Sequence, residues 1–595
     1  MKQFRMSLIK KYTLIIGQFL LLIFIFSIKS NGQTVNLSDL SQYKEKLSSI
    51  PLYKIKGNIS SNLLYNSGSN LGVNNTILWT GTGHLDLTIL NKINVPVTLN
   101  LSTAGIGYKL PQSPSRINFK PTYKWVKGHI GTSNMTFSPY TLNGHLFSGI
   151  GLELEPPQKH LKIAVMYGKL QRAVTYDSTN LNFRSAAYER NGYGAKVEYE
   201  QPKYNVGVSI FSAKDRYASL FTKPDSLGVT PQQNFVVSYA VVLKPSKGLL
   251  FNGEFATSLY TSDIRTPLIN QSTFNSIKHL NYAYRESTKQ NQAFKIQLGY
   301  NIKKTVIGFL VERVDPGFQS LGSYFINNDL ENFALNLSRI FLDNKLTIAG
   351  NFGTQKDNVK HTKTSTSNRF LGALNINYNP NEKLFNSFNY SSFKTYMYVQ
   401  PQLQSLSQLA MAQYQNLDTL NFKQVSENAI YTLNYKLKST EAISKSFNVN
   451  FNYQNAANVQ SGSLIEASSI ETKYYNSSIA YLYAIKSLGL RLNAIYNINF
   501  STQGGISNTS TNGPTIAAFY SMLKKKLNLG ATISYNHSSF IQTNKVINTF
   551  INRISADYKI KNNSLRFDLM LQSRTGSAGK STFNTMGNLS YNMSF

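Results

Sequence analysis

The chain ends in the stretch Phe583-Asn584-Thr585-Met586-Gly587-Asn588-Leu589-Ser590-Tyr591-Asn592-Met593-Ser594-Phe595. Successive side chains of an extended strand point to opposite faces. One face of this strand is therefore apolar and ends in an aromatic residue: Gly587, Leu589, Tyr591, Met593 and Phe595. The other face carries only serine and asparagine in its last eight residues. This two-sidedness is typical of a barrel wall with lipid outside and water inside.

Tyr591, Met593 and Phe595 resemble the C-terminal assembly signal of bacterial outer-membrane β-barrel proteins. The resemblance implies that a barrel-assembly machinery recognises this strand. It also implies a location in the outer membrane of a Gram-negative bacterium, in contact with outer-membrane lipid and lipopolysaccharide. The resemblance is to the class as a whole, so it indicates no narrower family and no catalytic or binding residues.

The beginning of the chain predicts export. Residues 1–32 combine a basic start, the apolar run Phe19–Phe26 and the small-residue end Ser30-Asn31-Gly32, which is typical of a signal peptide. Residues 33–51 predict a short periplasmic segment with one helix, ended by Pro51. Residues 52–595 are then expected to form the barrel. With no cysteine in the chain, disulfides and a lipid-modified N-terminus are excluded.

Period-two alternation dominates from Leu52 onward, and it predicts an all-β fold: a transmembrane antiparallel up-and-down β-barrel of about 26 strands, within a range of about 22 to 28. A hydrophobic fraction of 41% and a mean hydropathy of −0.25 fit strands with one wet face. The abundant Tyr (37) and Phe (35) fit interfacial aromatic girdles. Connections alternate between short turns, expected in the periplasm, and long extracellular loops such as 262–290 and 502–513.

The formal charge of +33 does not predict a nucleic-acid partner, because no compact basic cluster or basic helix is present. Many lysines lie beside the short turns, where they can reach lipid headgroups. A second interpretation is that basic residues also line the lumen and attract anions. The residues predicted to face the lumen are His84, Asp86, Lys196, Glu198, Glu200, Arg491, Arg566 and Asp568. Since acidic and basic side chains alternate among them, the selectivity of the lumen stays open.

Two segments are candidates for narrowing the lumen or contacting a partner. In Met135–Pro156, Pro139 cannot donate to a strand ladder and Asn143-Gly144 is a turn signal. This segment is either an ordinary hairpin tip or an inward bend that presents Tyr140, His145 and Phe147 to the pore. Within the longest predicted loop, the helical spacing of Leu403, Leu406, Leu409 and Tyr414 predicts an apolar segment that folds into the barrel mouth or docks a partner.

The sequence shows no catalytic or cofactor motif. The seven histidines have no metal-ligand spacing, and nucleophile elbows, Walker loops and zinc-protease motifs are absent. We therefore expect no cofactor, no metal and no enzymatic activity. The function that we expect is a transport or export pore for a large or polymeric solute, constricted by inward-folded loops. The alternative is a non-conducting barrel that anchors or assists a secreted or surface protein. Residues 33–51 are too short for the plug domain that the resemblance implies for TonB-dependent transporters.

Overall fold

The computed structural model describes residues 53–68, 76–103, 115–157, 160–175, 186–220, 228–269, 282–362, 366, 368–396, 422–460, 471–503, 507–577, 579 and 581–595. Contacts divide the chain into two units: Met1–Lys54 with Ile89–Asn91, and Ile55–Thr88 with Lys92–Phe595. Of the first unit only residues 53–54 and 89–91 are described. The barrel is the second unit. The signal peptide, the helix of residues 33–51 and the segment of Leu403, Leu406, Leu409 and Tyr414 lie outside the described residues.

The described chain is almost entirely strand. Its first half contains β1 (Tyr53–Gly68), β2 (Thr76–Ile89), β3 (Ile93–Ser102), β4 (Arg116–Phe119), β5 (Thr122–Tyr123), β6 (Val126–Thr136), β7 (Asn143–Leu154), β8 (Leu161–Gln171), β9 (Glu189–Glu200), β10 (Tyr204–Arg216), β11 (Gln233–Leu243), β12 (Leu249–Thr261), β13 (Thr288–Ile302) and β14 (Thr305–Val314). Its second half contains β15 (Leu330–Phe341), β16 (Leu346–Lys356), β17 (Asn368–Asn381), β18 (Leu384–Tyr396), β19 (Phe422–Ser439), β20 (Ile443–Gln460), β21 (Glu471–Ile485), β22 (Leu490–Gln503), β23 (Ser507–Met522), β24 (Leu527–Phe540), β25 (Lys545–Ile560), β26 (Asn563–Gly576) and β27 (Ser581–Ser594). Two short 3-10 turns, Tyr217–Ser219 and Leu342–Asn344, complete the described elements.

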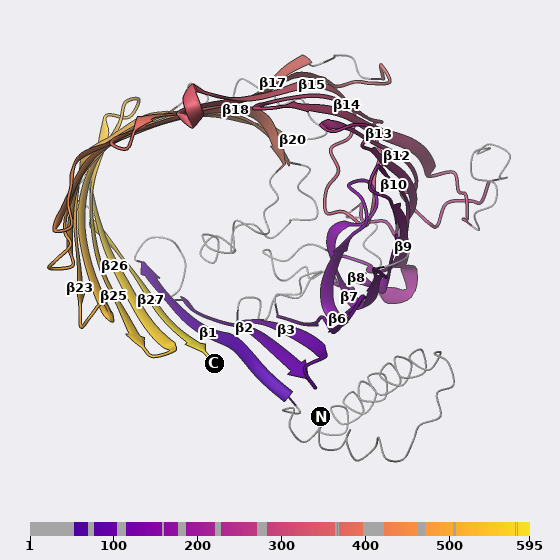
Figure 1. The fold of residues 1–595 in the computed structure, drawn as a ribbon, viewed down its shortest axis with the longest axis horizontal. Coiled ribbons are helices and arrows are strands. Elements are labelled where there is room, and N and C mark those ends of the chain that lie inside the picture. The colour runs from indigo at the N-terminus through magenta and orange to yellow at the C-terminus, as the bar shows by residue number, and fades with distance from the viewer. Residues whose placement is uncertain are drawn as a thin grey trace. The chain divides into compact units, whose positions relative to one another are not determined.

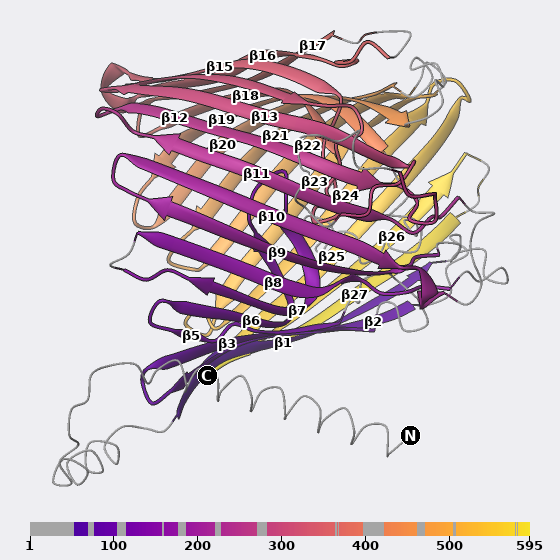
Figure 2. The same ribbon diagram turned by 90° about the vertical axis from the view of Figure 1, so that its right-hand side faces the viewer.

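These strands form one closed antiparallel barrel (Figures 1 and 2). Apart from β4 and β5, each strand pairs with its chain neighbours, and β27 pairs with β1 from Asn584 opposite Gly68 to Ser594 opposite Asn58. The segments β4 and β5 both pair with β3 and β6, so they occupy one position in the wall. The wall strand is interrupted there at Pro121, which lacks an N–H donor. The described residues thus make 26 wall positions, which confirms the predicted fold class and strand number.

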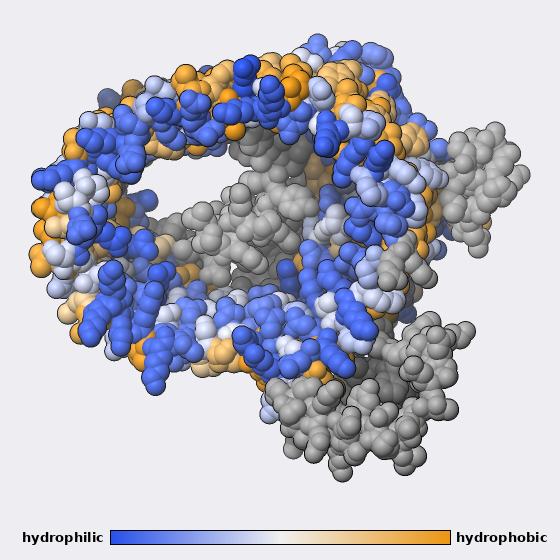
Figure 3. All heavy atoms as spheres, in the orientation of Figure 1, coloured by the Kyte–Doolittle hydropathy of each residue, from blue (hydrophilic) through white to orange (hydrophobic). Residues whose placement is uncertain are grey.

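The two faces of the wall differ in chemistry. Along β27, Leu589 and Tyr591 are exposed on one face, and β26 presents Leu565 and Phe567 to the same side. The intervening positions are polar, as the sequence pattern predicts. Figure 3 shows hydrophobic residues on the outer rim of the wall and hydrophilic residues on the inner side. An exposed apolar band around a closed barrel is the surface that lipid covers.

The connections alternate in length as predicted up to β21, but from β22 onward both ends have short connections, such as 523–526 at one end and 541–544 at the other. Short turns such as 303–304, 382–383 and 561–562 lie at one end of the strands, and longer connections such as 262–287 and 315–329 lie at the other end. One predicted long loop was wrong. Residues 507–513 of the expected loop 502–513 belong to β23 and pair with β22, from Ser507 opposite Gln503 to Gly513 opposite Asn497. Their serine, threonine and asparagine residues predict a loop from composition, because polar residues fill both faces of the strand there.

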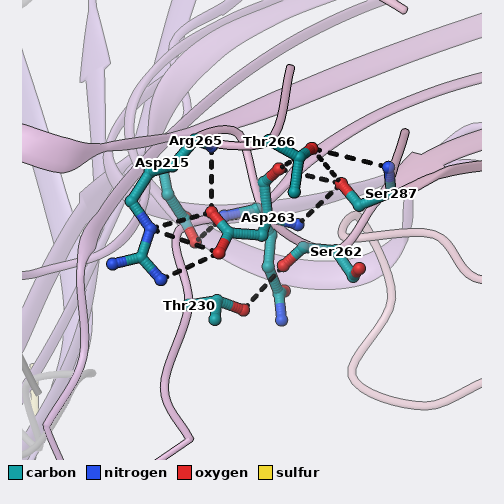
Figure 4. A network of polar contacts seen from close by, with 8 residues as sticks. Asp215, Thr230, Ser262, Asp263, Arg265, Thr266 and Ser287 are labelled. Atoms are coloured by element: carbon teal, nitrogen blue, oxygen red, sulfur yellow. Dashed lines mark hydrogen bonds and ion pairs between the residues drawn. The ribbon is translucent and has the colours of Figure 1, made fainter. Parts of the chain in front are cut away.

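Polar contacts fix the beginning and end of the β12–β13 connection (Figure 4). Asp263 pairs with Arg265 at 2.8 Å, and this guanidinium holds the pKa of the Asp263 carboxyl below its usual range. Ser287 Oγ donates to the Asp263 carbonyl at 2.8 Å, and Thr230 Oγ1 donates to the Ser262 carbonyl at 2.6 Å. The described part of this long connection is therefore attached to the barrel end. No helix among the described residues is long and apolar enough to span a membrane.

Candidate functional site

The connection between β6 and β7 folds onto the inner face of the wall. This first inner segment, Phe137–Leu142, starts where β6 ends at Thr136 and closes with a hydrogen bond from the Phe137 N–H to the Leu142 carbonyl at 2.8 Å. Phe137 and Leu142 join a buried apolar cluster with inward-facing residues of β8 and β10, including Met166 and Phe211. The apolar side chains of the segment are thereby removed from water, which stabilises its inward position.

The connection between β14 and β15 supplies a second inner segment, Asp315–Asp329. Its Phe318 lies edge-on to the Tyr140 ring at a centroid distance of 5.8 Å. Ser320 Oγ donates to the Thr141 carbonyl at 2.6 Å, and the Asn143 N–H donates to the Gly322 carbonyl at 2.9 Å. The bonded residues Thr141 and Ser320 are 179 positions apart in the chain, yet the two segments form one inner layer. In both ribbon views, chain from β6 and β7 lies on the inner side of the wall (Figures 1 and 2).

Asn234 of β11 attaches the second inner segment to the wall. Its side chain is fully buried and its Nδ2 donates to Leu259 O at 2.9 Å and to Gln319 O at 3.2 Å. The Leu321 N–H donates to Asn234 Oδ1 at 3.0 Å. A buried amide that satisfies two backbone groups of one segment holds that segment in a single position, because releasing it leaves several polar groups without partners.

Glycines on the inner face make room for this layer. A Cβ added at Gly168 would lie 2.8 Å from Phe147 Cδ2, and one added at Gly192 would lie 2.8 Å from Leu170 Cδ1. A Cβ at Gly322 would lie 2.7 Å from Phe211 Cε1. Sequence reasoning missed these residues and the whole second inner segment. A signal was present in the sequence, because glycines occupy inward positions of the neighbouring strands β8 and β9.

The side chains of Tyr140, His145 and Phe147 are buried, so the expectation that they are presented to the pore was wrong. The segment does bend inward, but these side chains point into its contacts. Tyr140 Oη donates to Glu312 Oε1 at 2.8 Å, and burial raises the pKa of this phenol well above its usual range. His145 stacks on Tyr324 at a centroid distance of 4.2 Å. The turn signal Asn143-Gly144 instead begins β7, where Gly144 has a positive φ of 66°.

The opposite part of the inner surface is hydrophilic. We call it the polar wall and define it as the inner faces of β22–β27, β1 and β2. Its neighbouring strands exchange side-chain hydrogen bonds, such as Thr515 Oγ1 with Ser534 Oγ at 2.7 Å and Ser590 Oγ to Asn62 Oδ1 at 2.9 Å. A cavity of about 360 Å³ there is lined by hydroxyl, amide and charged side chains: Ser60, Asn62, Thr80, Thr82, Asp557, Ser564, Arg566, Ser590 and Asn592. Figure 3 shows the hydrophilic character of this side.

The eight residues predicted to face the lumen all lie on the polar side of their strands, but in separate places. His84 and Asp86 of β2 lie 3.4 Å apart. On β9, Lys196 pairs with Glu198 at 2.9 Å, and Glu200 pairs with Lys162 of β8 at 2.6 Å. The remaining three residues, Arg491, Arg566 and Asp568, line one cavity. Sequence reasoning missed Arg553 and Asp557, which line the same cavity.

The residues of the predicted assembly signal lie at the barrel seam. Tyr591 is exposed on the outer face of β27, Phe595 is exposed directly after that strand, and Met593 faces Ile59 of β1 in the register. The Phe595 N–H donates to the Gly57 carbonyl at 3.0 Å, and the Gly57 N–H donates to the Phe595 carbonyl at 2.9 Å. The last residue of the chain therefore takes part in closing the barrel. Its recognition by an assembly machinery remains a prediction.

One arrangement resembles a catalytic triad. His129 Nδ1 lies 3.0 Å from Ser133 Oγ, and His129 Nε2 lies 2.7 Å from Glu153 Oε1. Ser133 is only 1% exposed and His129 only 2%, so no substrate reaches the hydroxyl. The network instead satisfies polar groups beneath the inner layer. Among the described residues no group of three or more His, Cys, Asp or Glu could hold a metal ion.

No protein-family model matches the sequence, and no curated protein matches it. Solved structures with some similarity include OccAB4 of Acinetobacter baumannii, with 10% identity, a TM-score of 0.28, and coverage of 92% of this chain and 99% of that one. The P pilus usher (PapC) translocation pore has 10% identity and a TM-score of 0.33, with coverage of 91% and 99%. The FrpB iron transporter of Neisseria meningitidis has 10% identity and a TM-score of 0.36, with coverage of 93% and 82%. At these values none of them indicates what this chain does.

Proposed function

We propose that the protein is a non-enzymatic outer-membrane pore that transports or exports a large or polymeric hydrophilic solute through a lumen narrowed by the inner layer. The exposed apolar face of the wall supports the membrane location. The alternation of connection lengths supports an orientation with the short turns in the periplasm. The strand number supports conduction, because barrels of about 16 to 18 strands already enclose an aqueous channel.

The observation that carries this proposal is the contrast between the two sides of the lumen. On the side of β8–β15 the inner layer is packed with apolar side chains and fixed by hydrogen bonds. On the other side the polar wall presents hydroxyl and amide groups along eight strands. A row of neutral donors and acceptors can exchange hydrogen bonds with a solute that repeats such groups, and it can do so at many positions along the path.

The experiment is conductance of the purified protein in planar bilayers, with polyethylene glycols of increasing size as probes of the lumen. The variant Phe318→Ser/Leu321→Ser removes two buried apolar contacts of the second inner segment. The exposed residue Leu268, on the β12–β13 connection, supplies the control Leu268→Ser. We expect steady current from the wild type and the control. The double variant should conduct more and admit larger polymers.

Absence of current from the wild type and the double variant alike would refute the pore. Current from the double variant alone would favour the alternative, a barrel that anchors or assists a secreted or surface protein. The segment on which that alternative was based, Leu403–Leu417, lies outside the described residues, and no described feature favours it. The pore is therefore the function that the structure supports best.

A further inference from the structure

A cavity of about 340 Å³ lies at the short-turn end of the polar wall, on the inner faces of β22–β26. We call it the turn-side cavity. Arg491 lies one residue after the start of β22, directly beyond the turn 486–489. At the same end, Ser521 and Asn528 lie on either side of the turn 523–526, and Asp557 and Arg566 lie on either side of the turn 561–562. Three arginines and two aspartates line the cavity: Arg491, Arg553, Arg566, Asp557 and Asp568.

Two of the three arginines are neutralised by the two aspartates. Arg553 pairs with Asp568 at 3.0 Å, and Arg566 pairs with Asp557 at 3.1 Å. Arg491 has no ion pair within the part of the chain that the structure describes. The cavity lining therefore carries one net positive charge, and that charge is located at Arg491. Because the paired arginines remain more than half exposed, their remaining N–H groups are also available as donors.

An aromatic ring of the neighbouring strand positions the Arg491 side chain. Its guanidinium lies over the ring of Phe519, its cross-strand partner, at 5.6 Å from the centroid. Phe519 in turn lies opposite Gly530, where an added Cβ would be 3.0 Å from Phe519 Cδ1 and 2.5 Å from Ser555 Oγ. Gly530 thus leaves space for the Phe519 ring on which the Arg491 guanidinium stacks. A cation stacked on an aromatic ring keeps its donors directed away from the wall, toward the cavity.

The surrounding turns add positive charge. The turns 486–489, 523–526 and 561–562 contain Lys486, Lys524, Lys525, Lys526 and Lys561, and no acidic residue. Basic groups around a concave surface raise the local concentration of anions and direct them inward. The opposite end of the same strands does not share this bias to the same degree, since the turn 541–544 between β24 and β25 contains no lysine or arginine.

We propose that the turn-side cavity is a binding site for an oxyanion, a carboxylate, phosphate or sulfate group carried by the solute, with Arg491 as its principal ligand. That the anionic group belongs to a transported solute rests on the proposed function, whereas binding of the group itself does not. A guanidinium fits such groups because its donors match a pair of oxyanion oxygens. The pore would then select acidic solutes at its short-turn mouth, and the hydroxyl and amide groups of the polar wall would contact the rest of the molecule.

The test is isothermal titration of the purified full-length protein with inorganic pyrophosphate, inorganic sulfate and tricarballylate. We expect at least one of them to bind, and we expect Arg491→Gln to weaken that binding about tenfold or more, as loss of a charge-assisted contact does. Arg491→Lys should restore part of the affinity. Arg339→Gln is the matched control, because Arg339 lies near the same end of the barrel on the outer face, beside Phe341. The probe that binds best identifies the class of oxyanion.

A second readout is the reversal potential in a KCl gradient across a planar bilayer. Arg491→Gln should shift it toward cation selectivity, and Arg339→Gln should leave it unchanged. Binding that is absent, or unchanged in Arg491→Gln, would overturn the inference even if the wild type conducts. Binding that depends on Arg491 in a protein that never conducts would support the site and refute the pore, so the two failures are distinguishable.

Discussion

The hydroxyl of Tyr140, at the tip of the first inner segment, donates a 2.8 Å hydrogen bond to the carboxylate of Glu312 on the inner face of β14. These residues are 172 positions apart, and the contact joins the segment that follows β6 to β14. Together with the ring contact between Tyr140 and Phe318, it fixes the first inner segment at its far end. The position of the first inner segment therefore depends on specific contacts that substitution can remove one at a time.

Tyr140→Phe keeps the ring but leaves Glu312 without this donor. A hydrogen bond to a charged group contributes about 1.5 to 3 kcal/mol, so the protection of residues 137–142 against hydrogen exchange should fall about tenfold to a hundredfold. Tyr167→Phe is the control, because Tyr167 is exposed on the outer face of β8. Equal protection in the wild type and Tyr140→Phe would show that the hydrogen bond does not hold the segment.

Asn234→Ala should release the second inner segment, because its Nδ2 and Oδ1 satisfy the Gln319 carbonyl and the Leu321 N–H. Leaving such buried groups unsatisfied costs about 1 to 3 kcal/mol each. Limited proteolysis of the folded protein should then cut within residues 315–329 while the barrel stays intact. Asn252→Ala removes an inward amide of β12 that contacts Gln297 and not the inner layer, and it should not increase cleavage. Cleavage at the same rate in both variants would contradict the anchoring role.

Gly322→Val should displace the second inner segment from the wall. The added Cβ would lie 2.7 Å from the ring of Phe211, which is buried and cannot move without opening the apolar cluster. Overpacking of this kind costs about 1 to 3 kcal/mol. In planar bilayers the variant should show larger and noisier conductance than the wild type. Gly299→Val is the control, since nothing lies closer than 3.9 Å to a Cβ at that inward glycine of β13. Conductance that matches the control would argue against an inner layer that limits flow.

Removal of Ser594 and Phe595 should impair barrel closure, because the last residue exchanges two backbone hydrogen bonds with Gly57. We expect less heat-modifiable, folded protein in the membrane fraction than for the wild type. Phe595→Tyr keeps both the backbone contacts and an aromatic ring, and it should assemble normally. Normal assembly of the truncated chain would mean that neither the seam contacts nor the terminal aromatic is needed.

The wall could be predicted from the sequence because each strand repeats the same two-residue pattern. Alternation such as that of Leu589 and Tyr591 with Ser590 and Asn592 indicates which face of a strand meets lipid and which meets water. The lengths of the connections indicate which end of the barrel each connection belongs to. The Thr502–Gly513 error arose where polar residues fill both faces of a strand. At such a position the two-residue pattern is missing, and composition alone indicates a loop.

The inner layer could be predicted only in part. Pro139 indicated a bend, but the partner of Tyr140 is Glu312, and no local pattern identifies a contact between residues so far apart in the chain. The same limit applies to the turn-side cavity. Arg491 and Arg566 were recognisable as inward residues, but their placement around one cavity with Arg553 depends on the register of several strand pairs.

Thiol modification tests the central claim, that the polar wall lines the conducting path, most directly. The chain has no cysteine, so a single introduced thiol is the only target for a negatively charged methanethiosulfonate reagent. Ser590→Cys places it on the polar wall, and Leu589→Cys places it on the outer face one residue away. We predict that the reagent lowers single-channel current through Ser590→Cys and leaves Leu589→Cys unchanged. Unchanged current through a fully modified Ser590→Cys protein would contradict the account.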